Sequence, residues 1–365
     1  MVQHTSFITI LTSGNSLGAY VPGIRLVEKL CQRGIPAEAE VLERLFPEEI
    51  RRNMIRTKQL FHSSFGAAKM GTRLARDIGL VLDDHAVRKL LQRWKAEGRS
   101  TFLAVTGFWI PIMKQYELLM HPKPIRIEFL RLDAVDTPSY RPYFNQDNRF
   151  RDHWLFQLEG EATSLHARLV MSDEALIPYL ERERRIVVHG GGWGIGTYRS
   201  TIAALQQHYP LAFVAYDVGE AQEALPNDRV YMTDPEWHPW LDETLPDGQF
   251  PYPPTAEWKR NEPLIYERSA NGPPLYEVIR SSIAIVSKPG GGTLIDSLSA
   301  ATPLIYLEPF GEHERANAEL WERLGFGISY ERWSQAGFSW ELLHELHHNL
   351  KSNALSLSDF GGIYA

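Results

Sequence analysis

A glycine-rich turn in the last third of the chain holds the residue types best suited to bind an anion. Lys288 and Thr293 flank Gly290, Gly291 and Gly292, directly after an apolar stretch. Glycines let the backbone approach a ligand closely, and a helix that starts near Thr293 presents unpaired N–H groups with partial positive charge. The lysine ammonium and the threonine hydroxyl add donors, so the pattern favours a diphosphate over a carboxylate.

Asp296 lies one helical turn beyond Thr293, where its carboxylate can accept hydrogen bonds from paired ribose hydroxyls. The turn is neither a Walker loop nor a Gly-x-Gly-x-x-Gly fingerprint, because its glycines are spaced differently. The alternative is an ordinary strand-to-helix turn whose glycines serve only tight packing. The anion site, unlike the packing turn, requires open space facing the opposite domain.

The segment 282–327 resembles the nucleotide-sugar glycosyltransferases of GT-B fold, which include macrolide, plant-type and lipid-linked peptidoglycan transferases. The resemblance is carried by the turn 288–293, Asp296, the break 300–303, the segment 309–313 and the pair Asn317-Ala318. It implies that the nucleotide diphosphate is bound by Lys288, Gly290, Gly291, Gly292, Thr293 and Asp296. It also implies that Glu312 and His313 contact the sugar, although the family has an acid-Gln pair there and His313 departs from it.

Two other loops match the family more weakly. The glycine loop 190–196 is similar to the one that opens the family's C-terminal domain, which implies that the amides of Gly191 and Gly192 face the distal phosphate. The first loop resembles the acceptor-side loop, so we expect acceptor contacts from Ser13, Gly14, Asn15 and the aromatic Trp109. The family commonly has a His three residues before Pro22, and Ala19 stands there, so the usual general base is missing.

An inverting transfer needs a group that accepts the proton of the acceptor hydroxyl. Asp133 and Asp136, on a loop after a predicted strand of the N-terminal half, are the candidates for this general base. The alternative for both is a solvated loop residue. On the leaving-group side, helix-end amides, Lys288 and Thr293 would stabilise the diphosphate without a metal.

Alternating strands, glycine-rich loops and helices position these residues. Apolar β-branched runs predict strands at 7–11, 37–42, 101–109, 125–132, 186–189, 211–216, 283–286 and 304–307. Loops after parallel strands share one edge of a sheet, where such folds bind ligands. We therefore expect an α/β protein of two Rossmann-like, doubly wound domains facing across a cleft: 1–180 for the acceptor, 184–340 for the nucleotide sugar, then a C-terminal helix and tail, 341–365. The segment 234–272, rich in Pro and Trp, is expected to form a long loop or a short insertion between elements.

Composition limits the other classes of function. A formal charge of −7 repels polyphosphate, which argues against nucleic-acid binding. Cys31 is the only cysteine, so intrachain disulfides and thiolate zinc cages are excluded, and a reducing, cytoplasmic setting is expected. No uninterrupted apolar run is long enough for a membrane span, and no secretory signal is evident.

Three rival patterns occur. The run 344–348 has the His-Glu-x-x-His spacing of a zinc site, but Leu342, Leu343, Leu346 and Leu350 predict an ordinary helix with the histidines on its polar face, and we expect no metal. Asp217 follows a strand as the ribose-binding acid of a Rossmann oxidoreductase does, without the required glycine spacing. The tryptophans at 237, 240 and 258 suit either stacking on a sugar or loop packing.

The sequence thus predicts an inverting, metal-independent glycosyltransferase that moves a sugar from a UDP- or TDP-sugar to a small-molecule acceptor such as a natural product. No cofactor is expected, the partners are donor and acceptor, and a homodimer is compatible with the sequence. A nucleotide-sugar hydrolase or 2-epimerase on the same fold is the main alternative. A catalytically silent nucleotide-sugar-binding partner is the other.

Overall fold

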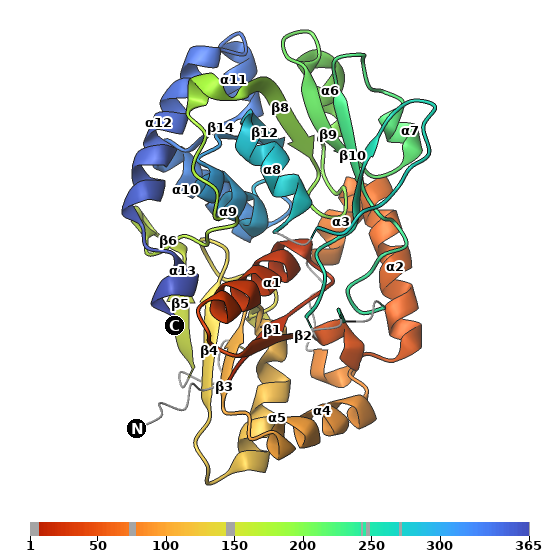
Figure 1. Cartoon of the computed structure of the whole chain (residues 1–365), viewed down its shortest axis with the longest axis vertical. Coiled ribbons are helices and arrows are strands. Elements are labelled where there is room, and N and C mark those ends of the chain that lie inside the picture. Colours follow the sequence, from red (N-terminus) through yellow and green to blue (C-terminus); the bar gives the residue numbers. More distant parts are fainter. Residues whose placement is uncertain are drawn as a thin grey trace.

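The structure is a computed structural model that describes residues 7–72, 78–143, 150–241, 244–245, 249–269 and 272–364. Two sheets lie one above the other, the first in the lower half of Figure 1 and the second in the upper half. They span residues 8–154 and 183–329, whereas the domain limits near 180 and 340 remain predictions. Within the described ranges, no helix combines the length and apolar character that a membrane crossing requires.

The first sheet is parallel throughout and has the strand order β2-β1-β3-β4-β5. Its strands are β1 (Ile8–Thr12), β2 (Ala37–Val41), β3 (Thr101–Ala104), β4 (Arg126–Arg131) and β5 (Arg151–Trp154). The chain reverses its direction of winding between β1 and β3, so the loops after these two strands diverge. Such a switch point is where doubly wound sheets leave a ligand-binding crevice.

The second sheet has the order β11-β10-β9-β8-β12-β13-β14 and is parallel except for its edge strand β11. Without β11 the order is 3-2-1-4-5-6, that of dinucleotide-binding folds, with the switch point between β8 and β12. The strands are β8 (Glu183–His189), β9 (Leu211–Ala215), β10 (Arg229–Thr233), β11 (Thr255–Trp258), β12 (Ser282–Ser287), β13 (Leu304–Tyr306) and β14 (Gly327–Ser329). These observations confirm the predicted fold class.

Helices cover both sheets. Those of the first half are α1 (Leu17–Gln32), α2 (Glu48–Ser63), α3 (Phe65–Thr72), α4 (Asp84–Ala96) and α5 (Ile110–Met120). Those of the second half are α6 (Arg199–Leu205), α7 (Val218–Ala221), α8 (Pro274–Ser281), α9 (Gly291–Ala300), α10 (Glu312–Arg323), α11 (Tyr330–Gln335), α12 (Trp340–Ser356) and α13 (Phe360–Ile363). A hairpin of β6 (Phe156–Glu159) and β7 (Ala162–Leu165) packs through β6 on α10.

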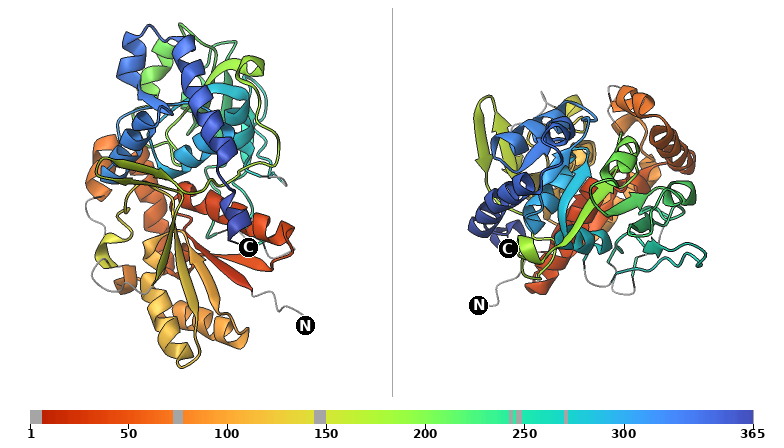
Figure 2. Two further views of the ribbon diagram at one scale, coloured as in Figure 1. Left: turned by 90° about the vertical axis from the view of Figure 1, so that its left-hand side faces the viewer. Right: turned by 90° about the horizontal axis from the view of Figure 1, so that it is seen from above.

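The two halves share one hydrophobic core. A single cluster of buried residues includes Ile10 and Leu103 of the first sheet together with Ile285 and Leu294 of the second half. Helix α1 packs on α9, and α13 returns to lie beside α1, as both Figure 1 and Figure 2 show. Apolar burial therefore favours a conformation in which the halves are in contact.

Three sequence expectations differ from the structure. β3 ends at Ala104, because a turn follows in which Gly107 packs so tightly on Tyr140 that a Cβ would collide. The segment 234–272 is not all loop, since β11 pairs with β10. His347 of α12 is buried rather than on a polar face, and its Nδ1 lies 2.7 Å from the Ala301 carbonyl oxygen. Burial lowers the pKa of His347 to about 4, so the ring is neutral and donates this hydrogen bond.

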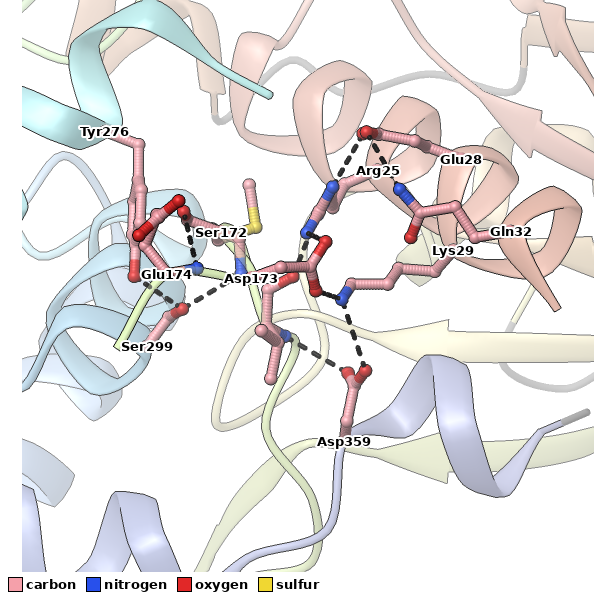
Figure 3. A network of polar contacts seen from close by, with 12 residues as sticks. Arg25, Glu28, Lys29, Gln32, Ser172, Asp173, Glu174, Tyr276, Ser299 and Asp359 are labelled. Atoms are coloured by element: carbon pink, nitrogen blue, oxygen red, sulfur yellow. Dashed lines mark hydrogen bonds and ion pairs between the residues drawn. The ribbon is translucent and has the colours of Figure 1, made fainter. Parts of the chain in front are cut away.

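A network of charges ties α1 to the segment that connects the two sheets (Figure 3). The Arg25 side chain is 2% exposed; it donates to the Val170 carbonyl oxygen (2.9 Å) and pairs with Glu28 (2.8 Å) and Asp173 (3.2 Å). Lys29 also pairs with Asp173. The buried guanidinium thus joins helix and connector through two acceptors, the Val170 carbonyl and Asp173, and Asp173 itself is 61% exposed.

We expect Arg25→Met to lower the free energy of unfolding by about 3 kcal/mol, because the substitution leaves the acceptors of the buried guanidinium without their donor. Asp173→Asn should cost less than about 1 kcal/mol, since water screens this exposed carboxylate and Glu28 still pairs with Arg25. Urea denaturation of both variants measures the difference. Equal losses of stability would show that the exposed pair, not the buried guanidinium, holds the connector.

Candidate functional site

The two glycine loops of the second sheet meet at its switch point. The loop 190–196 follows β8, and the turn 288–293 follows the adjacent strand β12. Gly191 has a φ of +71°, and a Cβ there would lie 3.5 Å from Cε of Lys288, so the lysine side chain runs along this loop. His189 accepts the Gly191 N–H at Nδ1 (3.0 Å), and burial together with Lys288 lowers its pKa to about 4. One cationic and one neutral side chain thus line the switch point.

The start of α9 offers unpaired donors. Gly290 N–H donates to the Lys288 carbonyl oxygen (2.9 Å), which closes the turn. The next three amides, of Gly291, Gly292 and Thr293, donate to no group in the part of the chain that the structure describes. Lys288 forms an ion pair with Glu314, which is 2% exposed. The end of α9 therefore keeps its positive partial charge, while Lys288 already has an anionic partner.

The space that the anion interpretation requires is closed in this structure. A Cβ on Gly291 would collide with the Leu132 carbonyl oxygen, and one on Gly292 would lie 3.0 Å from Cα of Gly18. On the neighbouring loop, a Cβ on Gly192 would collide with Leu17. These glycines therefore do serve close packing between the halves, as the packing alternative proposed. A diphosphate can reach the turn only if the halves separate.

Asp133 lies on the glycine turn. Its carboxylate oxygen accepts from Asn317 Nδ2 (2.7 Å) and lies 3.0 Å from where a Cβ of Gly291 would stand. Burial raises the pKa of Asp133, against the opposing effect of His313 and Lys288. The carboxylate therefore stands at the positive end of α9, the place predicted for phosphate, and not at a separate proton-accepting position.

The second base candidate, Asp136, is engaged elsewhere. Its carboxylate pairs with Arg131 (2.6 Å), whose guanidinium also lies over the Tyr140 ring. Burial raises the pKa of Asp136, and Arg131 opposes the rise. An ion-paired carboxylate of this kind stabilises the loop, and nothing in its surroundings favours proton abstraction.

The remaining donor-side residues lie around α9 and α10. Asp296 is half-buried on α9, and burial raises its pKa to about 7. Glu312 pairs with Arg315 (3.4 Å) at an exposed position, whereas Nδ1 of His313 is buried and has no hydrogen-bond partner within the described part of the chain. Throughout the described ranges, no three His, Cys, Asp or Glu side chains are placed to hold a metal ion together.

The first loop binds a carboxylate from its own domain. The Ser13 hydroxyl (2.6 Å) and the amides of Gly14 (2.6 Å) and Asn15 (2.9 Å) all donate to Glu43, which is 1% exposed. The predicted acceptor-side loop is thus an anion-binding nest with an internal occupant. Trp109, predicted to face the acceptor, is fully buried and donates to the Thr12 carbonyl oxygen (2.9 Å), so it belongs to the core.

Helix α2 supplies functional candidates that sequence reasoning missed, because their partners lie 130 or more residues away. His62 places Nδ1 2.7 Å from the Gly194 carbonyl oxygen and Nε2 3.1 Å from Glu220, and its ring stacks on Tyr216 at 3.8 Å. Both partners are acceptors, so only a protonated ring satisfies both. Burial lowers the pKa of His62, but the Glu220 and Gly194 bonds outweigh it, and the net shift is upward.

Helices α2 and α3 thus form a strap between the halves. In Figure 1 these orange helices extend upward from the first sheet to the second. Phe65 of α3 stacks near Phe310 (ring centroids 6.3 Å apart), and Lys69 pairs with Glu308. The strap therefore contacts the loop 190–196 and the loop that follows β13, which both lie beside the glycine turn.

Comparisons with known proteins agree with this architecture. No protein-family model matches the sequence, and neither does any curated protein. The chain is similar to the spinosyn rhamnosyltransferase SpnG complexed with thymidine diphosphate, at 12% identity over 98% of both chains and a TM-score of 0.55. It is equally similar to MurG of Acinetobacter baumannii (12% identity, 98% and 97% covered, TM-score 0.55). The glycosyltransferase VinC in complex with dTDP gives 10% identity, the same coverage and a TM-score of 0.56. The chain therefore has the GT-B fold of two Rossmann-like domains that the sequence predicted.

The closed arrangement should depend on pH through His62. Its pKa is raised in the closed form, so its contribution to closure is complete below about pH 6.5 and is lost as pH rises through the raised value. We expect the ratio of the radius of gyration at pH 8.5 to that at pH 5.5, measured by small-angle scattering, to be larger in the wild type than in His62→Gln. This comparison separates His62 from the other buried groups that titrate. His85→Gln, at an exposed site of α4, should keep the wild-type ratio. Equal ratios in all three proteins would contradict the proposed role of His62 in closure.

Proposed function

We propose that the protein is a glycosyltransferase that moves a sugar from a nucleotide-diphosphate sugar, UDP- or TDP-linked, to a small-molecule acceptor with inversion and without a metal. The observation that carries the proposal is the meeting of two helix N-termini. Gly18, in the first turn of α1, contacts Gly292, in the first turn of α9, at the switch points of both sheets. When the halves part, these two positive helix ends face the opened space from both sides, and both favour a multiply charged anion there.

The proposed donor site follows from the surroundings of α9. The amides of 291–293 and Lys288 would hold the diphosphate, and the growing charge on the leaving diphosphate would be stabilised by donors already in place. Asp296, one turn further, would accept the ribose hydroxyls. To admit the diphosphate, the halves must open and the Asp133 carboxylate must leave the end of α9, since two anions repel each other there.

The chemical step would be a single displacement. The acceptor oxygen forms a bond to the anomeric carbon while the bond to the diphosphate oxygen breaks, and the electron pair leaves with the diphosphate. Closure of the halves would exclude water, which otherwise competes as acceptor. The neighbours SpnG, with thymidine diphosphate, and VinC, with dTDP, support a pyrimidine nucleotide donor.

Thr293→Val and Asp296→Asn are expected to weaken TDP or UDP binding about 10-fold each, the loss of roughly one good hydrogen bond. Their pH responses should differ. Burial raises the pKa of Asp296 to about 7, so the carboxylate that would accept the ribose hydrogen bonds becomes protonated as pH falls from 8 to 6. Nucleotide affinity should therefore fall over this range in the wild type and in Thr293→Val. Asp296→Asn should lack the fall that is due to Asp296. Calorimetry at both pH values decides, and unchanged affinity in both variants would remove the site assignment.

Lys288 requires a paired design, because Lys288→Met alone leaves Glu314 buried without its partner. The double variant Lys288→Met with Glu314→Gln removes both charges and should reduce nucleotide affinity about 10-fold or more without the stability loss of the single variant. Glu314→Gln alone is the matched control. Calorimetry and thermal unfolding measure the two quantities separately.

Turnover separates the enzyme classes that share this fold. The protein is incubated with UDP-, TDP- and GDP-sugars, with and without hydroxylated acceptors, in the presence and absence of EDTA. We expect nucleotide release that depends on an acceptor and is insensitive to EDTA. Release that is equal without any acceptor indicates a hydrolase, interconverted sugar indicates an epimerase, and binding without turnover indicates an accessory protein.

A further inference from the structure

A compact group of aromatic and basic side chains lies between the halves, beside the glycine loop. Lys58 of α2 places Nζ 3.1 Å from the ring centroid of Trp193 and 4.3 Å from that of Trp240. The His238 ring stacks on Trp240, with centroids 5.0 Å apart, and lies 6.0 Å from Trp193. We refer to Lys58, Trp193, His238 and Trp240 as the tryptophan–lysine cluster.

Three polar atoms of this cluster are buried. Lys58, His238 and Trp240 are 5%, 5% and 3% exposed, and their atoms Nζ, Nδ1 and Nε1 have no hydrogen-bond partner among the residues that the structure describes. Each such group costs about 1–3 kcal/mol when it is left unsatisfied. Three of them in one place are rare in a native core and are expected where a ligand supplies the missing partners.

The cluster touches both loops that the proposed reaction needs. Trp193 directly follows Gly191 and Gly192, and its Nε1 donates to the Asn15 carbonyl oxygen (2.8 Å) of the first loop. Gly14 of that loop packs so closely on Pro239 and Trp240 that a Cβ would lie 2.7 Å from Pro239 Cβ. The cluster therefore lies beside the start of α1, where Ala19 replaces the histidine common in the resembling family.

The two carboxylates considered from sequence are not placed to accept the proton of the acceptor hydroxyl. An inverting base must lie across the sugar from the leaving group. Asp133 stands on the glycine turn, on the side of the leaving diphosphate, and Asp136 is paired with Arg131. Lys58 instead lies on the side of the first loop, because it contacts Trp193, whose indole is hydrogen-bonded to that loop.

We propose that the tryptophan–lysine cluster binds the hydroxyl of the acceptor and that Lys58 Nζ accepts its proton during transfer. The inference rests on the proposed function. The acceptor O–H bond breaks, its oxygen bonds to the anomeric carbon, the diphosphate departs with the electron pair of the broken C–O bond, and the proton forms an ammonium on Lys58. Once the halves part to admit it, a planar hydroxylated acceptor, of which a phenol is the simplest example, can stack on the indole faces.

The electrostatics around Lys58 suit a proton acceptor. Burial lowers the pKa of Lys58 to about 6, with Glu43 opposing, so the amine is neutral at pH 7 to 8. Burial and Lys58 lower the pKa of His238 to about 4, which leaves this facing ring neutral too. Once protonated, the ammonium is stabilised by the two indole faces and by Glu43. The Lys58 amine can therefore take up a proton during the transfer, although it is uncharged beforehand.

The test compares Lys58→Met with the wild type and with Lys123→Met, an exposed control. UDP-glucose and TDP-glucose are the donors, and 4-methylumbelliferone and water are the acceptors. We expect Lys58→Met to lower nucleotide release about 10²–10⁴-fold at saturating donor while leaving the Kd for UDP and TDP unchanged. The wild-type rate should fall as pH drops below about 6, and the variant's residual rate should not.

A second readout separates catalysis from structure. Lys58→Met removes a buried, unsatisfied amine, so its Tm at pH 7.5 should rise by about 2 °C or more, whereas a structural lysine would lower it. Unchanged turnover, a lowered Tm, or a wild type that binds nucleotide but uses neither acceptor each overturns the inference. A wild type that binds no nucleotide overturns the proposed function instead.

Discussion

The approach of two helix N-termini is the constraint on which the rest of the structure depends. Helices α1 and α9 each begin just beyond the carboxyl end of a central strand, and their first turns touch at Gly18 and Gly292. A Cβ on Gly292 would lie 3.0 Å from Cα of Gly18, so glycine at position 292 lets the two domains approach this closely. Because both ends carry partial positive charge, the closed form is stable only with negative charge close by.

Internal carboxylates supply that charge. Glu43 accepts three hydrogen bonds from the loop 13–15, and Asp133 lies at the first residue of α9 with Asn317 as its partner. Glu43 is held by its own domain, whereas Asp133 reaches across to the other half. Opening withdraws only Asp133 from α9, which makes that end the one able to exchange an internal anion for a bound one.

The central strands β1 to β4, β8, β9, β12 and β13 and the two glycine loops could be predicted from sequence, because apolar runs and glycines act locally. The outer strands β5, β10, β11 and β14 and the hairpin β6–β7 were not predicted. The roles that failed depend on long-range packing. Trp109 is of a residue type that often contacts ligands, yet its indole N–H donates to a backbone carbonyl oxygen in the core. Lys58 and His62 look like surface residues of a charged helix, and only the fold brings Trp193 and Glu220 to them. For Gly291 and Gly292 the sequence left anion binding and tight packing both open, since the neighbours that decide between them come from the other half of the chain.

Domain motion and protonation are coupled in such an arrangement. Burial causes the upward pKa shift of Asp133 and the downward shifts of Lys58 and His238, and Asp133 and Lys58 meet residues of the opposite half. Separation of the halves hydrates these groups and returns their pKa values toward ordinary ones, so Lys58 gains a proton on opening and releases it on closure. By linkage, a fall in pH favours the open form through Lys58, opposite in sign to the effect of His62.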